Sequence, residues 1–162
     1  MILCIRIYTK KEGIMGKDNN EGLIEAKELA KYIINTSPSD LSNLMLQKTM
    51  YFVELDYRKH NNGQRLIKEE FEAWQYGPVV RDVYEEYRDY GSRYIERTDE
   101  VQISGDIKNI IDLSIDRCSD KSAWELVEES HRSDGAWQKS KDMGLATIDE
   151  ALITEEAEKY GE

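Results

Sequence analysis

Apolar residues recur at helical spacing through residues 44–63, around which the rest of the chain is organised. The stripe consists of Leu46, Met50, Val53 and Tyr57, and it is widened by Leu44, Tyr51 and Leu55. A helix that is apolar over so much of its circumference is normally buried on several sides. The pattern therefore predicts the central helix of one compact domain, capped by Asp40 or Ser42 and ended by Asn61-Asn62-Gly63.

Shorter apolar stripes predict further helices on both sides of the central one. Residues 23–35 form one, with an apolar face of Leu29, Tyr32 and Ile33 and small spacers at Ala26 and Ala30. A second stripe consists of Ile107, Ile110, Ile111, Ile115 and Cys118. Ser122-Ala123-Trp124-Glu125 matches a capping box, which predicts a helix from Ala123 to about His131. Thr154 is the expected cap of a last short helix that ends near Tyr160.

The apolar period changes between the central helix and residue 91. Apolar and polar residues alternate from Glu70 to Trp74, which predicts a short strand, with residues 65–68 as its candidate partner in a hairpin. Gly77-Pro78 is then expected to form a turn, with Pro78 at the first position of a helix. The core face of that helix consists of Val80, Val83, Tyr84 and Tyr87. The predicted fold class is mainly α with a small β-hairpin (α+β), in a single compact helical domain.

The N-terminal residues 1–22 stand apart from this pattern. Their apolar run, MILCIRIY, is short and leads into charge, so it is not a signal-peptide core. It is interpreted as an added edge strand or as a translated leader, in which case Met15 is the true start. Gly16 to Gly22 is polar, as in a flexible lead-in. We therefore treat residues 1–22 as an N-terminal extension and residues 23–160 as the domain.

Composition narrows the class of partner. The formal net charge is −11, and nucleic-acid affinity depends on clustered cations, so direct nucleic-acid binding is not expected. The charge is compatible with a basic protein partner, although solubility alone is the favoured explanation. Cys4 and Cys118 form neither a disulfide framework nor a metal-ligand spacing, which favours reduced thiols in the cytoplasm. No apolar run approaches the roughly 20 residues that a membrane span needs, so no membrane partner is expected.

Catalytic chemistry is sparse in the sequence. His60 and His131 are the two histidines, and neither lies in a metal-binding pattern. Both are expected at helix ends, where a histidine more often interacts with the helix terminus than with a substrate. Cys118 belongs to an apolar face and is expected in the core. There is no P-loop, nucleophile elbow or dinucleotide fingerprint, so the sequence predicts neither a cofactor nor a metal site.

Aromatic residues are the more informative candidates. Tyrosine and tryptophan fill cores, and they are also enriched at interaction hot spots. Core positions are expected for Tyr51, Tyr84 and Trp124, whereas an interface position stays open for Trp74, Tyr76 and Tyr87 because they lie near Gly77-Pro78. Lys48 interrupts the apolar stretch of the central helix, and we expect it either to extend to the surface or to meet a carboxylate.

Two runs of residues, LxLQKxxYF at 44–52 and EAWxYGPVV at 72–80, make the chain resemble the Panacea domain family, which includes phage-associated proteins and SocA-like antitoxins. The resemblance continues at Val83, Tyr84 and Gly91, and more weakly at Leu126, Val127, His131 and Trp137. In this chain Ser130 stands where the family pattern has threonine. The resemblance covers roughly residues 23–160 and leaves residues 1–22 outside.

The resemblance implies a mainly helical fold with a small hairpin and an antitoxin that neutralises its cognate protein toxin by direct contact. The candidate partner-binding residues are Trp74, Tyr76, Gly77, Pro78, Tyr87, Lys48 and His131. Two alternatives remain open. One is a proteolytic adaptor that delivers a bound toxin to a cytosolic protease. The other is an enzyme with a pocket of His131, Lys48 and a carboxylate, although the sequence favours a protein without enzymatic activity and leaves the oligomeric state open.

Overall fold

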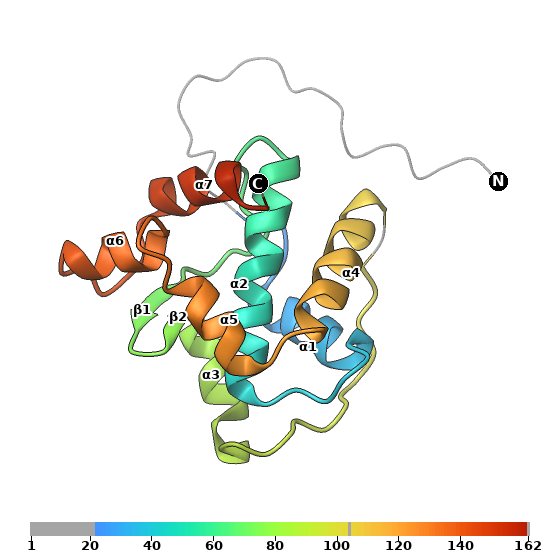
Figure 1. Ribbon diagram of the computed structural model, residues 1–162. Coiled ribbons are helices and arrows are strands. Elements are labelled where there is room, and N and C mark those ends of the chain that lie inside the picture. The colour runs from blue at the N-terminus through green and yellow to red at the C-terminus, as the bar shows by residue number, and fades with distance from the viewer. Residues whose placement is uncertain (1–21, 104, 162) are drawn as a thin grey trace.

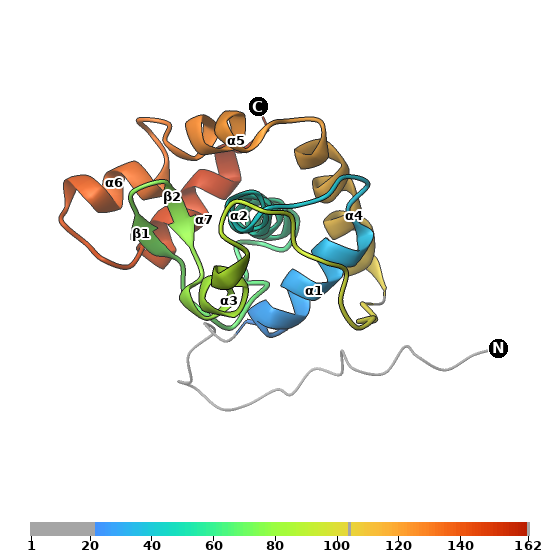
Figure 2. The ribbon, with the colours of Figure 1, turned by 90° about the horizontal axis from the view of Figure 1, so that it is seen from below.

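A computed structural model describes residues 22–103 and 105–161 of the chain. In these residues the elements are α1 (Ala26–Thr36), α2 (Asn43–His60), β1 (Glu72–Trp74), β2 (Gly77–Val79), α3 (Arg81–Tyr87), the 3-10 turn η1 (Arg88–Tyr90), α4 (Asp106–Ser119), α5 (Ala123–Ser130), α6 (Ala136–Asp142) and α7 (Glu150–Lys159). Figure 2 shows α2 end-on, with the hairpin and the helices α1, α3, α4 and α5 around it. The predicted class, mainly α with a small hairpin, is confirmed.

Helix α2 is the centre of the hydrophobic core. Every residue from 45 to 58 is buried, as expected of a helix that is packed on all sides. Ser42 caps its start by accepting a hydrogen bond from the N–H of Met45. The chain leaves the helix through Asn62 and Gly63, both with positive φ. The central helix and both of its termini are therefore confirmed, with Ser42 rather than Asp40 as the cap.

Helices α1 and α4 pack on one side of α2. The residues that the sequence assigns to the core face of α1 are all buried, and Ile111, Ile115 and Cys118 of α4 are buried as well. Tyr32 Oη donates a hydrogen bond to Asp112 Oδ1 at 2.5 Å and so joins the two helices. These two helices form where the apolar stripes predict them.

The hairpin differs from its prediction. β1 pairs in antiparallel register with β2, with Glu72 opposite Val79 and Trp74 opposite Gly77. Residues 65–68 are not its partner, because Ile67 instead forms a parallel bridge with Ile24. Pro78 lies in β2, so its expected place at the start of a helix is wrong. A proline fits this strand because the ladder does not require its missing N–H.

Among the C-terminal helices, α5 and α7 pack on α2, whereas α6 packs on α7 and on β1. The capping box of Ser122 and Glu125 is present at the start of α5, as predicted. Helix α6 was not predicted as an element, because only the turn before Trp137 carries a sequence signal. Thr154 is not a cap, since it lies inside α7, where Asp149 accepts the hydrogen bonds of the first turn.

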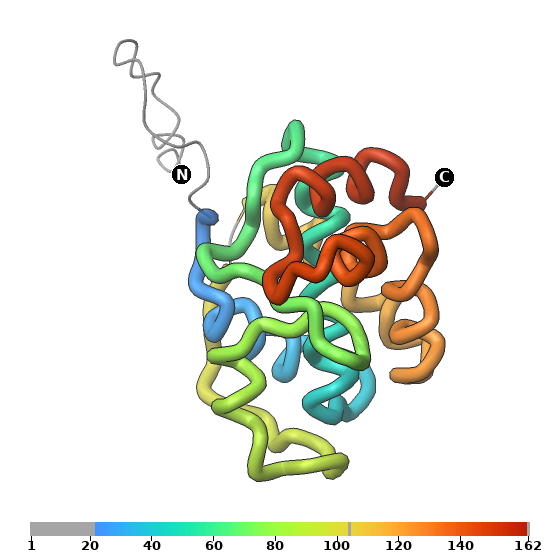
Figure 3. The backbone as a smooth tube through the Cα atoms, turned by 90° about the vertical axis from the view of Figure 1, so that its left-hand side faces the viewer, coloured from blue at the N-terminus to red at the C-terminus, as the bar shows by residue number. Residues whose placement is uncertain are grey.

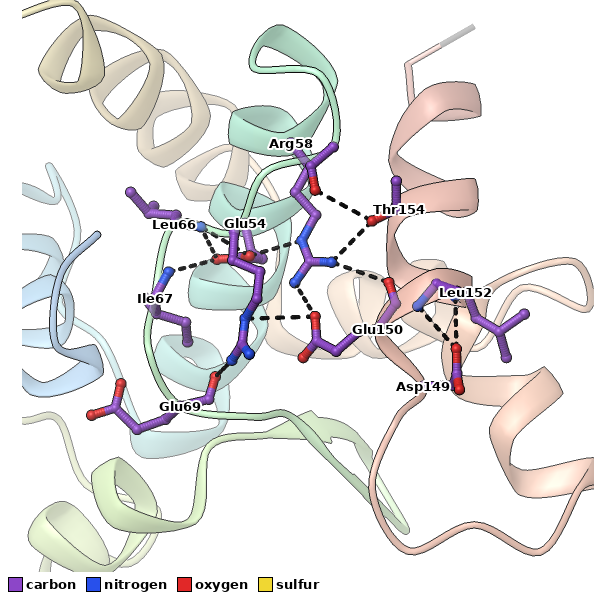
Figure 4. A network of polar contacts seen from close by, with 12 residues as sticks. Glu54, Arg58, Leu66, Ile67, Glu69, Asp149, Glu150, Leu152 and Thr154 are labelled. Atoms are coloured by element: carbon purple, nitrogen blue, oxygen red, sulfur yellow. Dashed lines mark hydrogen bonds and ion pairs between the residues drawn. The ribbon is translucent and has the colours of Figure 1, made fainter. Parts of the chain in front are cut away.

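A buried ionic network fastens α7 to α2 (Figure 4). Arg58 Nε donates to Glu54 Oε1 at 2.8 Å, and an Arg58 Nη donates to Glu150 Oε2 at 2.5 Å. Glu54 also accepts hydrogen bonds from the backbone N–H groups of Leu66 and Ile67. In Figure 3 the red C-terminal segment lies beside the green segment that follows α2, and Thr154 Oγ1 donates to the carbonyl oxygen of Gly63. The network lets a charged pair occupy the core because nearly every polar atom has a partner.

The predictions for the N-terminal extension, including the edge strand and the alternative start at Met15, fall on residues 1–21, which lie outside the described residues. Within the described part of the chain, no helix is both long enough and apolar enough to cross a bilayer.

Candidate functional site

Two neighbouring side chains of α2 hold the outer edge of β2. Gln47 Oε1 accepts a hydrogen bond from the N–H of Val80 at 2.9 Å, and Lys48 Nζ donates to the carbonyl oxygen of Pro78 at 2.6 Å. Gln47 in turn donates to Asn43 Oδ1 at 3.2 Å. Buried backbone groups at a strand edge need partners. Here a buried helix supplies them, so the hairpin is fixed to the core of the domain.

Lys48 is fully buried, so the prediction that it extends to the surface is wrong. The alternative prediction, a carboxylate partner, is also wrong. The Lys48 ammonium does not reach the surface, and no carboxylate in the described chain contacts it. Burial lowers the pKa of Lys48 from 10.5 to about 7, because the charged form loses its hydration. Its hydrogen-bond acceptor is the Pro78 carbonyl. Lys48 is thus a buried amine whose pKa lies close to neutral pH, and it positions the hairpin through its hydrogen bond to Pro78.

Gly77 allows the close approach of the hairpin to α2 and α5. Its φ is +100°, a conformation that residues with a side chain rarely adopt. A Cβ at this position would lie 2.6 Å from Ser130 Oγ and 3.0 Å from Lys48 Cε. Both the backbone conformation and the space therefore require glycine here.

An aromatic stack supports the other side of the hairpin. Trp137 Nε1 donates a hydrogen bond to the carbonyl oxygen of Trp74 at 2.8 Å. The His131 ring stacks on Trp137 with ring centroids 3.7 Å apart and an interplanar angle of 4°. Burial, and then the nearby charge of Lys48, lower the pKa of His131. A neutral imidazole is therefore favoured in this stack at neutral pH.

The enzyme hypothesis requires a carboxylate beside Lys48 and His131. The two residues lie in one neighbourhood, since the charge of Lys48 acts on His131 and both flank the space around Gly77. Burial alone shifts the pKa of Lys48, so no charged carboxylate acts on it within the described residues. Ser130, the nearby hydroxyl, is buried and donates to the carbonyl oxygen of Val127 at 2.8 Å. This arrangement is a closed support for the hairpin rather than an accessible pocket.

An open groove lies on the outer side of the same hairpin. It has a volume of about 410 Å³. Its lining residues are Asn43, Leu44, Gln47, Trp74, Gln75, Tyr76, Val79, Tyr84, Arg88 and Gly91. One wall is aromatic, because the rings of Trp74 and Tyr84 meet edge to face with centroids 4.8 Å apart. The groove is mainly apolar and has the dimensions of a small binding site.

A pair of exposed aromatic rings extends the groove toward α5. Tyr76, at the hairpin turn, is 49% exposed, and Trp124, in the first turn of α5, is 60% exposed. Their rings meet edge to face with centroids 5.7 Å apart. We call this feature the Tyr76–Trp124 pair. Large exposed aromatic side chains beside an apolar groove are typical of interaction surfaces.

The predicted partner-binding residues divide into two groups in the structure. Trp74 and Tyr76 line the groove. The other predicted residues do not line the groove. Lys48 is buried beneath the hairpin, and Gly77 and Pro78 are buried positions of β2 itself. Tyr87 is buried on α3, and His131 is half-buried at the end of α5. Both histidines are at helix ends, as expected, because His60 is the last residue of α2.

Trp124 is the main surface residue that the sequence analysis misplaced, because it is exposed rather than in the core. The helical period of α5 contains the missing signal. Leu126, Val127 and Ser130 are its buried residues. Trp124 lies two positions before Leu126, about 200° around a helix of this period, and so belongs to the opposite face. Tyr84 is half-buried and lines the groove instead of filling the core.

Metal and thiol chemistry do not single out another site in the described chain. No group of histidine, cysteine and carboxylate side chains that could hold a metal ion occurs there. Cys118 is buried in the core, as predicted, and burial raises the pKa of its thiol to about 12. An uncharged, inaccessible thiol is a poor nucleophile.

Comparison with known proteins relates the chain to antitoxins. A family model described as "Antitoxin SocA-like, Panacea domain" matches residues 46–138. The protein named Antitoxin SocA from Caulobacter vibrioides (strain NA1000 / CB15N) is 31% identical over 130 residues, which cover 70% of this chain and 69% of that protein. No solved structure matches the chain. The matched region contains α2 from Leu46 onward, the hairpin, α3, α4 and α5, and so most of the groove.

Proposed function

Because the chain belongs to the SocA-like antitoxin family of the Panacea domain, we propose that it is an antitoxin that neutralises a protein toxin by binding it directly. The related protein from Caulobacter vibrioides is named an antitoxin. The observation that supports direct binding is the Tyr76–Trp124 pair, which exposes two large aromatic rings beside the groove. Aromatic residues of this kind are enriched where proteins bind each other.

The structure offers this surface on a rigid support. Gln47 and Lys48 fix the hairpin from inside, and Trp137 fixes it from the α6 side. A preorganised surface loses less conformational entropy on binding than a mobile one. The net charge of −11 adds long-range attraction to a basic toxin.

Coexpression tests the proposal. The genes that neighbour the one for this chain are expressed singly in a bacterial host, and any that stop growth are coexpressed with this chain. We expect one such toxin to be neutralised and to copurify with the chain. The purified pair should also form a complex without any protease present, which separates direct binding from delivery to a protease. Rescue of growth without a complex would contradict direct binding.

A further inference from the structure

We infer that the toxin segment that enters the groove carries an apolar side chain flanked by lysine or arginine residues. The inference rests on the proposed function and adds the chemistry of the bound segment. It comes from three features of the surface, which are the apolar lining of the groove, the pairing of its cation, and the position of carboxylates on α5.

The groove is shaped for an apolar anchor. Leu44 and Val79 contribute aliphatic surface, and Trp74, Tyr76 and Tyr84 contribute ring surface. Its volume of about 410 Å³ accommodates a large aliphatic or aromatic side chain. Burying such a side chain stabilises a complex in proportion to the apolar area removed from water.

The cation that lines the groove is already neutralised. Arg88 is the charged residue among the lining residues, and its Nη1 donates to Glu85 Oε2 at 2.7 Å. The sequence of α3 and η1 contains two basic residues, Arg81 and Arg88, and four acidic residues, Asp82, Glu85, Glu86 and Asp89. The segment beside Arg88 therefore contains more acidic than basic residues, which does not favour an acidic ligand there.

The α5 rim is acidic as well. Helix α5 contains Glu125, Glu128 and Glu129, of which Glu129 pairs with Lys121 and Glu125 accepts a hydrogen bond in the capping box, so that Glu128 is the carboxylate left over. Glu128 is exposed, lies one turn after Trp124 on the same face of the helix, and has no ion-pair partner among the described residues. A cation beside Trp124 would therefore contact both a free carboxylate and an aromatic ring face, and the two attractions act in the same direction.

Site variants of the full chain test the inference against the toxin found by coexpression. Trp124→Ala and Glu128→Lys change the two features, and both residues are exposed, so the fold should persist. The matched controls are Leu113→Ala, an exposed apolar residue on α4, and Glu158→Lys, an exposed carboxylate on α7. Circular dichroism verifies that all four proteins are folded.

We expect Trp124→Ala to weaken toxin binding about tenfold or more. Glu128→Lys should slow association, by an amount that shrinks as salt is added, because the lost attraction is screened. Neither control should change the affinity. Among overlapping synthetic peptides of the toxin, those that bind the wild-type chain but not Trp124→Ala should combine apolar and basic residues.

Failure of the inference and failure of the proposed function give different results. If the wild-type chain binds no toxin, the proposed function fails. If the wild-type chain binds its toxin while Trp124→Ala and Glu128→Lys bind like the controls, the inference is overturned and the antitoxin function stands. A change in oligomeric state on size-exclusion chromatography with unchanged toxin affinity would also overturn it, because the pair would then join two copies of this chain.

Discussion

Lys48→Met tests the description of the buried amine most directly. Methionine has nearly the length of lysine and no charge, so it can occupy the same space. Two effects oppose each other. The substitution removes the free energy needed to bury an ammonium, and it leaves the Pro78 carbonyl without the hydrogen bond that Lys48 donates. The balance between them depends on pH, and this dependence is the test.

The magnitude follows from the pKa of Lys48, which burial lowers from 10.5 to about 7. At about 1.4 kcal/mol per pH unit, burying the charged form opposes folding by about 5 kcal/mol below pH 7. An unsatisfied buried carbonyl costs about 1–3 kcal/mol. The larger effect is the charge. We therefore expect Lys48→Met to be more stable than the wild type at pH 7, by about 2 kcal/mol.

The direction of the pH dependence is fixed by proton binding. Between about pH 7 and the ordinary pKa of lysine, the unfolded chain keeps the Lys48 proton and the folded chain loses it, so wild-type stability rises with pH. The useful window is about pH 7 to 8.5. Above it, the Cys118 thiol begins to ionise in the unfolded chain, while its folded pKa is about 12, and this lowers stability.

Urea unfolding followed by tryptophan fluorescence measures the difference. The wild type should gain about 2 kcal/mol of stability relative to Lys48→Met between about pH 7 and 8.5. Lys159→Met, at an exposed lysine of α7, is the control and should follow the wild-type pH dependence. If the free energies of unfolding of the wild type and Lys48→Met change in parallel with pH, the buried amine does not titrate in this range. If Lys48→Met is much less stable than the wild type at pH 7, the lost hydrogen bond outweighs the removed charge.

Three further substitutions test the supports of the hairpin and of α2. Gly77→Ala should destabilise the chain by about 1–3 kcal/mol in thermal unfolding, because Gly77 has a positive φ and a Cβ there would collide with Ser130 Oγ. Partial recovery of stability in Gly77→Ala/Ser130→Gly would separate the effect of this collision from that of the backbone strain. Arg58→Met should lower the free energy of unfolding, measured in urea, by about 3–5 kcal/mol, because Glu54 loses its buried ion-pair partner. A decrease no greater than that of a surface substitution would contradict a stabilising role of the ionic network. Ser42→Ala should lower the free energy of unfolding by about 1 kcal/mol, and Ser42→Asp should lower it much less, because aspartate also caps a helix. Equal decreases for the two variants would show that Ser42 does not act as a helix cap.

The helices could be predicted from the sequence because local signals specify them. Apolar period and capping residues are properties of neighbouring positions, and they locate α2, α4 and α5 well. The partner of β1 could not be derived in this way. Both 65–68 and 77–79 are short and close in sequence, and the choice depends on Gln47 and Lys48, which are distant in sequence and hold β2 in place.

The candidate site was predictable only in part, for the same reason. The aromatic composition pointed to Trp74 and Tyr76, which line the groove. The roles of Lys48 and Gly77 depend on a contact between α2, the hairpin and α5 that no local pattern records. Aromatic size favours a core position for Trp124, whereas helical phase places it on the surface, because the buried residues of α5 lie on the other face.

The family pattern includes both buried supports of the hairpin and residues that line the groove, such as Leu44, Trp74 and Tyr76. Gln47, Lys48, Gly77 and Pro78 also belong to the family pattern and are buried, the first two beneath the hairpin and the last two within β2. Substitutions there alter the support, whereas substitutions on the exposed faces of α5 and α3 leave it intact. If the chain binds its toxin at the groove, we expect exposed positions outside the family pattern, such as Trp124 and Glu128, to contribute to the specificity for one toxin. In that case the family pattern indicates the kind of partner, and we expect the surface charges around the groove to help select one member of that kind.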